Sequence, residues 1–405
     1  MPDVLIVGAG PAGSACAETL RDEGFAGSVL LAGREPDPPY DRPPASKEYL
    51  RGATTRESHR LYPESFWAER DIDLRARTSV MKLDPAARTA KLSTGEEVAF
   101  GSAVLATGAN VRRLRVEGAG LDGIHYLRTL GNSDAIRRDA VAGARAVLVG
   151  GSFIACEVAA SLTGLGVACT MVMIEAQPLS TGFGMQAGEF FGSLLRSRGI
   201  ELVCGDGLER FEGEAAPDDS PGRVQRVVTA SGRVLDADLV VMGTGAVPDV
   251  MLARSAGLAL GESGGVACDA ALRTSAEAIW AAGDICEYDS VVHGRRLRIE
   301  HWEVARAQGA HAARALLGAA EPYTEIPYFW SDLADWATLE YVGPAESWDR
   351  EVVRGSIGDG AFTIFYLAGD RVAAALTVGR SGDLDDARRL MTDRTAVDPA
   401  ALAAG

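Results

Sequence analysis

The sequence predicts an α/β protein in which two similar modules are followed by a smaller α+β unit. Residues 4–20 run from an aliphatic strand through a glycine-rich turn into an alanine-rich helix, and residues 146–157 repeat this order. Each copy continues into a group of short strands. Beyond residue 338, strands and one helix follow in another order, which indicates a third unit.

The composition is that of a globular chain and limits the classes of partner. The 405 residues are 47% hydrophobic and 24% charged, enough for two or three domains. The formal net charge of −16 argues against nucleic acid or an anionic membrane as the main partner, because both need a broad basic surface. No apolar run of about 18 residues and no leader segment is found, so we expect a cytoplasmic protein.

The cysteines predict neither a metal centre nor a disulfide framework. No two of them stand at Cys-x-x-Cys spacing, and no histidine lies at metal-ligand spacing from them. We therefore expect scattered, buried free thiols and no metal. The six are Cys16, Cys156, Cys169, Cys204, Cys268 and Cys286.

The first glycine-rich turn has the residues of a nucleotide cradle. Gly8 allows a tight turn after the strand, Gly10 a close approach of a diphosphate, and Gly13 the packing of the helix on the strand. The diphosphate would bind the free N–H groups at the start of the helix. Glu35 follows a second apolar run, where a carboxylate can bind ribose hydroxyls. The first module is thus predicted to be a Rossmann-like nucleotide-binding domain.

A proline-rich loop at residues 38–47 carries Arg42 and Lys47. Two interpretations stay open: a solvated basic loop, or a rigid segment that holds two cations beside a bound anion or an electron-rich ring. Residues 56–72 are expected to form one or two helices. Strands at 78–83, 89–93 and 98–106 follow, and the last ends in Ala106-Thr107-Gly108.

The second module repeats the first in its order of elements. Its strand ends at Gly150, a strand at 168–174 leads to Glu175, and strands at 224–229 and 239–243 end in Gly243-Thr244-Gly245. The similar lengths of the two modules indicate two nucleotide-binding domains of one build. The sequence leaves open whether the second is inserted within the first or follows it.

The second glycine pattern is imperfect. Ser152 replaces the glycine that a diphosphate approaches, and Ala155 replaces the glycine that packs on the strand. Ser152 adds a Cβ beside the diphosphate, although its hydroxyl could donate to a phosphate in exchange. Glu175 has no arginine near it and would repel a 2′-phosphate, which favours NADH over NADPH.

The remaining segments complete the chain. A buried strand at 272–284 ends in Gly283-Asp284, a basic cluster lies at 293–298, and a helix is expected at 304–317. A loop through residues 323–332 follows. The C-terminal unit has predicted strands at 338–342, 351–356, 362–367 and 372–378 and a helix at 383–391, and the tail from residue 393 is expected to fray.

Four further motifs carry a resemblance to a known family. They are Pro-Tyr-Asp-Arg-Pro-Pro-Ala-Ser-Lys at 39–47, Ala-Ala-Gly-Asp-Ile-Cys at 281–286, Ile-Glu-His-Trp-Glu-Val-Ala-Arg-Ala-Gln-Gly at 299–309 and Pro-Tyr-Phe-Trp-Ser-Asp at 327–332. Together with both glycine turns, they resemble the bacterial FAD- and NADH-dependent ferredoxin reductases that include putidaredoxin reductase and the reductase components of aromatic dioxygenases. These belong to the glutathione-reductase-like flavoproteins, and the resemblance covers residues 4–391.

The resemblance implies that the chain forms three domains. Residues 1–110 and 244–318 would form a discontinuous FAD-binding domain, residues 111–243 an NADH-binding domain, and residues 319–405 the C-terminal α+β domain. The FAD-binding residues would be Gly8, Gly10, Pro11, Ala12, Gly13, Glu35, Arg42, Lys47, Val80, Ala106, Thr107, Gly108, Arg112, Gly283, Asp284, Glu300, His301, Trp302 and Trp330. The NADH-binding residues would be Gly150, Gly151, Ser152, Phe153, Ile154, Glu157, Glu175 and Gly245.

The resemblance also implies a mechanism. NADH would pass a hydride to the flavin, which would release electrons singly to a small iron–sulfur ferredoxin that feeds an oxygenase. The catalytic residues would be Lys47 near flavin N5, Glu157 as its counter-ion, Trp302 along the flavin, and Trp330 on the partner-facing side. Because a chain of net charge −16 needs a local basic surface to dock an acidic ferredoxin, we expect docking at Arg295, Arg296, Arg298 and Arg306, and we expect a monomer or a homodimer.

Three departures from the family pattern and three alternatives remain. Ser152 and Ala155 alter the NADH site, Asn110-Val111 replaces Arg-Pro, and Ala45 replaces a leucine. The lack of paired cysteines disfavours a disulfide reductase. The acceptor could instead be a rubredoxin, the chain could be a redox-sensing flavoprotein similar to apoptosis-inducing factor, or it could be a binding module that has lost NADH.

Overall fold

The computed structural model describes residues 2–214 and 222–404. Their contacts divide the chain into two compact units. The first unit comprises residues 1–41, 59–110 and 247–329, and the second comprises residues 42–58, 111–246 and 330–405. Each unit therefore draws on three separate stretches of sequence, and each is described by itself below.

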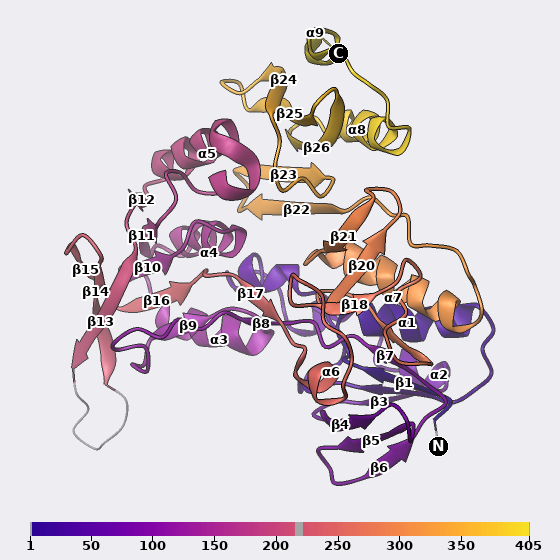
Figure 1. The fold of residues 1–405 in the computed structure, drawn as a ribbon. Coiled ribbons are helices and arrows are strands. Elements are labelled where there is room, and N and C mark those ends of the chain that lie inside the picture. The colour runs from indigo at the N-terminus through magenta and orange to yellow at the C-terminus, as the bar shows by residue number, and fades with distance from the viewer. Residues whose placement is uncertain (1, 215–221, 405) are drawn as a thin grey trace. The chain divides into compact units, whose positions relative to one another are not determined.

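The first unit is built on a five-stranded parallel sheet (Figure 1). Its order is β19-β7-β1-β2-β3, and Val4 of β1 pairs with Val29 of β2 on one side and with Ser102 of β7 on the other. The helices α1 and α7 pack closely on each other. Bounds are β1 Val4–Val7, α1 Pro11–Asp22, β2 Val29–Ala32, β3 Ile72–Arg75, β7 Ser102–Leu105, β19 Ile279–Ala281 and α7 Trp302–Leu316.

The second unit contains a parallel sheet of the same design. Its order is β12-β11-β10-β16-β9, so that β10, β11, β12 and β16 take the places that β1, β2, β3 and β7 hold in the first unit. Bounds are β9 Ile124–Tyr126, α3 Leu130–Asp139, β10 Arg145–Val149, α4 Phe153–Gly164, β11 Ala168–Met173, α5 Ser180–Ser197, β12 Glu201–Cys204 and β16 Leu239–Met242.

A three-stranded antiparallel meander accompanies each parallel sheet. β4 Val80–Asp84, β5 Thr89–Leu92 and β6 Glu97–Ala99 form the first, and β13 Leu208–Glu214, β14 Arg223–Thr229 and β15 Val234–Asp236 form the second. Because β19 completes the first sheet after the whole second sheet has been formed, the second module is inserted within the first. The sequence had left this open.

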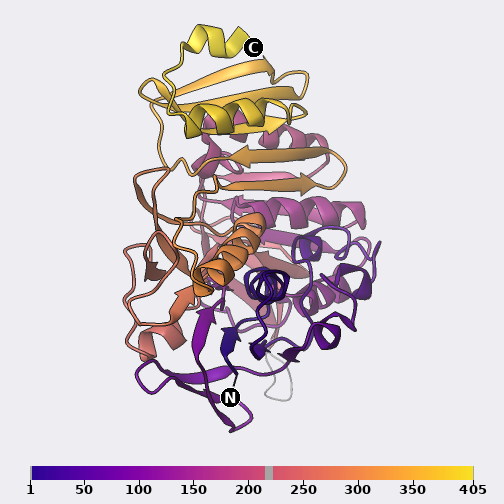
Figure 2. The same cartoon turned by 90° about the vertical axis from the view of Figure 1, so that its right-hand side faces the viewer.

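The C-terminal part of the second unit is an antiparallel sheet with α8 packed on β26 (Figure 2). Its order is β22-β23-β26-β25-β24. Bounds are β22 Tyr328–Leu333, β23 Ala337–Val342, β24 Arg350–Ser356, β25 Ala361–Ala368, β26 Arg371–Val378, α8 Asp383–Thr392 and α9 Pro399–Ala404. The smaller elements of the chain are η1 Pro43–Ser46, η2 Glu57–His59, α2 Phe66–Glu69, β8 Ala109–Val111, β17 Ala246–Pro248, α6 Met251–Ser255, β18 Val266–Cys268, β20 Cys286–Ser290 and β21 Arg295–Arg298.

The structure corrects several expected elements. The strand predicted at 98–106 is two strands, β6 and β7, because the chain turns at Gly101, where a Cβ would lie 2.8 Å from the carbonyl oxygen of Asp3. The helices expected over 56–72 shrink to η2 and α2, and β3 begins at Ile72. The predicted strand 272–284 is regular only over β19, and the loop through 323–332 contains β22.

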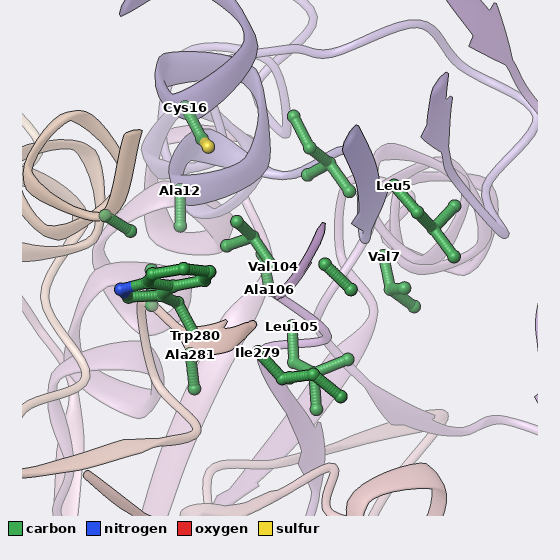
Figure 3. Close-up of a cluster of buried hydrophobic side chains, with 14 of the residues drawn as sticks. Leu5, Val7, Ala12, Cys16, Val104, Leu105, Ala106, Ile279, Trp280 and Ala281 are labelled. Carbon is green, nitrogen blue, oxygen red and sulfur yellow. The ribbon is translucent and has the colours of Figure 1, made fainter. Parts of the chain in front are cut away.

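The core of the first unit is apolar and built from the parallel strands and the helix that follows β1. Leu5, Leu105 and Ile279 contribute from the strands, and Cys16 from α1 (Figure 3). Trp280 of β19 is 8% exposed, so it is a core residue. Along the described part of the chain, no helix combines the length and apolarity needed to cross a membrane.

Candidate functional site

The first glycine-rich turn can form only because two of its glycines lack side chains. Gly8 has φ +112°, and a Cβ there would lie 2.1 Å from the carbonyl oxygen of Ala106. A Cβ at Gly13 would lie 1.8 Å from the carbonyl oxygen of Gly8. Gly10 begins α1 without a side-chain cap, and Pro11 takes the first helical position. The first N–H groups of α1 can therefore bind a diphosphate.

The acidic residue after β2 is held in place by a tyrosine that the sequence analysis did not single out. Tyr40 donates its phenolic proton to Glu35 Oε2 at 2.6 Å. A carboxylate at this edge of the sheet suits the ribose of a nucleotide. Nearby in the fold, Thr107 donates to the carbonyl of Asp249 at 2.7 Å, and Arg34 bridges Asp249 and Asn110 at 2.7 and 2.8 Å. Asn110, one of the family departures, thus anchors Arg34.

The Gly283-Asp284 turn comes together with the first glycine-rich turn. Gly283 has φ +79°, and a Cβ there would lie 3.1 Å from the Cβ of Ala12 in α1. Gln308, fully buried on α7, accepts the Gly283 N–H at 2.9 Å. The buried Nε2 of Gln308 has no partner among the described residues. Buried amides are normally satisfied, so this orphaned donor fits a bound polar group beside the turn.

The start of α7 carries the predicted flavin-lining residues. His301 stands at the N-cap position of α7 without a side-chain capping hydrogen bond. Its ring contacts that of Phe329 with centroids 4.3 Å apart, and its buried Nδ1 has no partner among the described residues. Burial lowers the pKa of His301 to about 4, so the imidazole is neutral near pH 7. The Arg306 guanidinium lies over the Trp302 ring at 5.3 Å. Glu300 accepts a 2.5 Å hydrogen bond from Arg298.

These features of the first unit fit FAD. The α1 turn offers free N–H groups to a diphosphate, and Glu35 offers a carboxylate to a ribose. Gln308 and His301 each have a buried nitrogen without a hydrogen-bond partner among the described residues. Val80, also predicted here, is half-buried and packs against the hydrophobic core. Gly108 has φ +70°, which keeps the turn after β7 free of a side chain.

The second glycine-rich turn reproduces the first with two changes. Gly150 has φ +111°, and a Cβ there would lie 2.4 Å from the carbonyl oxygen of Gly243. Ser152 begins α4, donates its hydroxyl proton to Gly243 O at 2.8 Å and accepts the N–H of Ala155 at 3.5 Å. With its single proton on the Gly243 carbonyl, the Ser152 hydroxyl would have to leave that oxygen to donate to a phosphate, so this expectation stays a prediction.

The carboxylate after β11 has a buried oxygen without a partner among the described residues. This oxygen is Glu175 Oε2, and a Cβ at Gly151 would lie 3.3 Å from it. An unpaired carboxylate oxygen suits the hydroxyls of NADH and repels a 2′-phosphate. Ile154 is 38% exposed on the first turn of α4, and Phe153 packs edge-on against Phe183.

The segment from Gly243 to Gly245 pairs with the chain that enters this unit. Gly245 has φ +88° and accepts the N–H of Arg112 at 2.9 Å, and Thr244 donates to the Arg112 carbonyl at 2.9 Å. Arg112, predicted for FAD, is thus tied through its backbone to the predicted NADH segment. Arg42 donates to the carbonyl of Arg128 at 2.9 Å, so its guanidinium is anchored within the second unit.

The second unit also contains a buried ion pair. Lys47 Nζ lies 2.9 Å from Glu157 Oε1, and the two residues are 7% and 5% exposed. Two serine hydroxyls reach the same carboxylate, which the sequence analysis did not foresee. Trp330, half-buried on β22, precedes one of these serines.

The predicted docking arginines are largely neutralised. Arg296 pairs with Asp289 at 2.8 Å, Arg298 with Glu300, and Arg306 with Glu18 at 3.4 Å. Arg298 also donates to the Asp284 carbonyl at 3.1 Å, which gives it a place in the candidate FAD site. Arg295 is exposed on β21, a strand where a basic cluster was expected.

The cysteines of the described residues form no disulfide. All six cysteines are free, and all except Cys204 are buried. Burial raises the pKa of Cys16 to about 12 and that of Cys169 to about 11, so both are protonated near pH 7. The described residues hold no cluster of His, Cys, Asp or Glu suited to a metal ion.

Two family models and several known proteins match the chain. The family described as pyridine nucleotide-disulphide oxidoreductase matches residues 2–309, and that described as reductase C-terminal matches residues 328–405. Rhodocoxin reductase of Rhodococcus erythropolis is 33% identical over 396 residues, covering 98% of this chain and 91% of that protein. The ferredoxin–NAD(+) reductase component of the anthranilate 1,2-dioxygenase system of Burkholderia cepacia is 36% identical over 403 residues, covering 98% and 96%.

A solved structure is similar over nearly the whole chain. The covalent putidaredoxin reductase–putidaredoxin complex superposes with a TM-score of 0.93 at 34% identity, covering 99% of this chain and 95% of that chain. The predicted fold class, two Rossmann-like units with a C-terminal antiparallel sheet, is confirmed.

Proposed function

Because the chain belongs to the pyridine nucleotide-disulphide oxidoreductase family, we propose that it is an FAD-dependent NADH:ferredoxin oxidoreductase serving an oxygenase in the cytoplasm. The observation that carries the proposal is the pair of glycine-rich cradles without any reactive cysteine pair. A disulfide reductase needs such a pair, whereas a reductase that delivers electrons directly from its flavin does not.

The first unit would hold FAD. The α1 turn would bind the diphosphate, Glu35 a ribose, and the Gly283-Asp284 turn the remaining polar groups. When bound, FAD links a two-electron hydride donor to one-electron acceptors. His301 is neutral, so its buried Nδ1 can exchange a hydrogen bond with the flavin ring without adding a charge.

The second unit would hold NADH. Gly150 and Gly151 would admit the diphosphate to the start of α4, and Glu175 would accept the ribose hydroxyls and select against NADPH.

The Lys47 ammonium, held by Glu157, would stabilise the negative charge of the reduced flavin. Trp302 and Trp330 would flank the ring.

An anaerobic titration of the FAD-loaded protein with NADH tests the proposal. We expect NADH to bleach the flavin at stoichiometric amounts and more readily than NADPH does. The reduced protein should then reduce a purified [2Fe–2S] ferredoxin faster than a rubredoxin. If dithionite bleaches the flavin and NADH does not, the chain is no NADH-dependent reductase. Fast transfer to rubredoxin alone would reassign the acceptor.

A further inference from the structure

Helix α5 of the second unit is interrupted near its beginning. Gly184 has φ +77° and ψ 176°, which are not helical dihedrals. A Cβ at this position would lie 2.0 Å from Glu351 Oε1 and 3.1 Å from the ring of Trp348, so both the backbone and the space require glycine. The break separates residues 179–183, called the 179–183 turn below, from the rest of the helix.

The 179–183 turn contacts the residues on both sides of the one that begins α4. Leu179 donates its N–H to the Gly151 carbonyl at 2.9 Å. The ring of Phe183 packs edge-on against that of Phe153, with centroids 5.3 Å apart. Leu179 and Phe183 are both buried. The turn thus supports the start of α4, where the second glycine-rich cradle lies.

The C-terminal sheet of the same unit holds both sides of the break. Tyr366 of β25, which is fully buried, donates its phenolic proton to the Phe183 carbonyl at 2.8 Å. After the break, Gln186 donates from its amide to Glu351 Oε2 of β24 at 2.8 Å. The other oxygen of this carboxylate accepts a hydrogen bond from Trp348 Nε1 at 3.0 Å. Strands β24 and β25 therefore fix the point at which α5 changes direction.

We propose that Tyr366 is a positioning residue through which the C-terminal sheet sets the affinity of the second unit for its dinucleotide. The inference rests on the proposed binding of NADH at the start of α4. The Tyr366 hydroxyl fixes the Phe183 carbonyl, and the 179–183 turn in its fixed position supports the cradle. A site that is ordered before its ligand arrives loses less conformational entropy on binding and binds more tightly.

The direction of the effect follows from this order. Tyr366→Phe keeps the ring, which packs against Trp348 with centroids 4.6 Å apart, and removes only the hydroxyl. The 179–183 turn is then less restrained, and a smaller fraction of the molecules holds the cradle ready. The apparent Kd rises as that fraction falls. A hydroxyl that served stability alone would change the free energy of unfolding and leave the Kd unchanged.

The test is the Kd of the oxidised, FAD-loaded protein for NAD⁺, measured by isothermal titration calorimetry. Tyr366→Phe should raise it about fivefold, the size expected for one lost buried hydrogen bond. Tyr341→Phe on β23 is the matched control and should leave it unchanged. Tyr341 is also buried and its ring lies 5.0 Å from that of Phe183, but its hydroxyl donates to the Ala345 carbonyl at 3.5 Å.

Hydrogen exchange gives a second readout that needs no dinucleotide. The amide protons of Leu179 and Phe183, which are bonded to the carbonyls of Gly151 and Leu179, report on the 179–183 turn. Both should exchange several-fold faster in Tyr366→Phe and at the natural rate in Tyr341→Phe. Faster exchange with an unchanged Kd would show that the turn does not act on the dinucleotide, and would overturn the inference.

The outcomes separate this inference from the proposed function. A natural protein that does not bind NAD⁺ refutes the proposed function, and the inference with it. Binding by the natural protein with an equal Kd in Tyr366→Phe overturns the inference alone, as does equal weakening by Tyr341→Phe. Should Tyr366→Phe fail to fold, Gln186→Leu releases the other side of the break from Glu351 and should also raise the Kd. An unchanged Kd there is equally decisive.

Discussion

Gly10 begins α1 without a side-chain cap, whereas Ser152 begins α4 and forms hydrogen bonds with nearby backbone groups through its hydroxyl. The two turns also differ at a second pair of positions, one after the strand and one on the helix. A Cβ at Gly243 would lie 2.7 Å from the Cβ of Ala155 and 3.0 Å from Ser152 Oγ. In the first turn, Ala106 follows the strand and Gly13 lies on the helix. In the second turn the two residue types are exchanged, so that Gly243 follows the strand and Ala155 lies on the helix. Ser152, Ala155 and Gly243 form one packed set.

This set predicts that Ser152 weakens dinucleotide binding. Its Cβ narrows the approach of the diphosphate, and its Oγ competes for the Ala155 N–H. Glycine is an acceptable residue at a helix N-cap, so Ser152→Gly should fold normally. We expect the affinity of the oxidised, FAD-loaded protein for NAD⁺ to rise about fivefold, equivalent to roughly 1 kcal/mol, as measured by isothermal titration calorimetry.

Ser152→Ala serves as the control for this change, because it removes the hydroxyl and keeps the Cβ. A gain confined to the glycine variant assigns the effect to the Cβ. Equal gains would assign it to competition by the hydroxyl. Weaker NAD⁺ binding by Ser152→Gly than by the natural protein contradicts the argument.

At the scale of single residues, the sequence predicted which positions need glycine better than it predicted which groups the side chains bind. Gly8 and Gly13 were predictable because a glycine pattern reports a backbone that a side chain would block. The direction of the Ser152 hydroxyl was not, since its acceptor lies 91 residues away. The roles of Tyr40 and Gln308 were not predicted for the same reason, because their contacts depend on how the sheet and its helices pack.

At the scale of elements, the C-terminal tail is the clearest surprise. The expected frayed segment contains α9, with Leu402 buried. Arg354 on β24 donates from Nε to the Leu402 carbonyl at 2.9 Å and pairs with Asp383 of α8 at 3.0 Å. A single buried guanidinium thus fastens α8 and α9 to the sheet, a role that strand and helix patterns do not reveal.

Arg354→Met should therefore release α9 and destabilise the protein. We expect the free energy of unfolding in urea to fall by about 2–3 kcal/mol, because a buried charged hydrogen bond and its partners are lost. Limited proteolysis should cut near residues 399–404. The exposed Arg389, which pairs with Asp386, is the matched control, and Arg389→Met should change the free energy of unfolding by less than about 0.5 kcal/mol.

The pH dependence of this loss is determined by Asp383. Burial alone would raise the pKa of Asp383, but hydrogen bonds from Arg380, Thr363 and Arg354 outweigh it and lower the pKa below 3.8. A carboxyl with a lowered pKa stabilises the fold above its unfolded pKa and loses that contribution as the pH falls. The difference between Arg354→Met and the natural protein should thus persist above pH 4 and shrink below it.

The elements themselves were predicted unevenly. The other four C-terminal strands, β23 to β26, and α8 were found because short apolar runs and a hairpin turn mark the strands locally. β22 was missed, since its aromatic residues are only half-buried and show no alternation. The split between β6 and β7 was missed because Gly101 turns against Asp3, a contact that only the assembled sheet creates.

At the scale of the whole molecule, charge is the governing property. An acidic acceptor could dock on a protein of net charge −16 only at a local basic surface, and the paired arginines of the first unit offer little net positive charge. Arg298 must be left intact in any test, because it contacts the Asp284 turn. The informative positions are thus Arg295 and Arg296 on β21.

We expect Arg295→Glu with Arg296→Glu to slow ferredoxin reduction several-fold at low salt, with the difference shrinking as salt rises. Turnover of NADH with ferricyanide, which needs no docked protein, should stay unchanged. Arg145→Glu is the control, since Arg145 is also a surface arginine paired with an aspartate, Asp238. Equal slowing by the control would show a general effect of negative charge, and losses in both assays would place the two arginines in the nucleotide sites.

The insertion of one module in the other has a consequence for biosynthesis. When a ribosome has released residues 1–110, four strands of the first sheet are present, but the edge strand β19 and the helix α7 are still to be translated. The inserted sheet, β9 to β16, is contiguous and can fold meanwhile. The first cradle acquires Gly283 and Gln308 only afterwards. A nascent chain should therefore be able to retain flavin only near the end of synthesis, which makes flavin supply a late step in maturation.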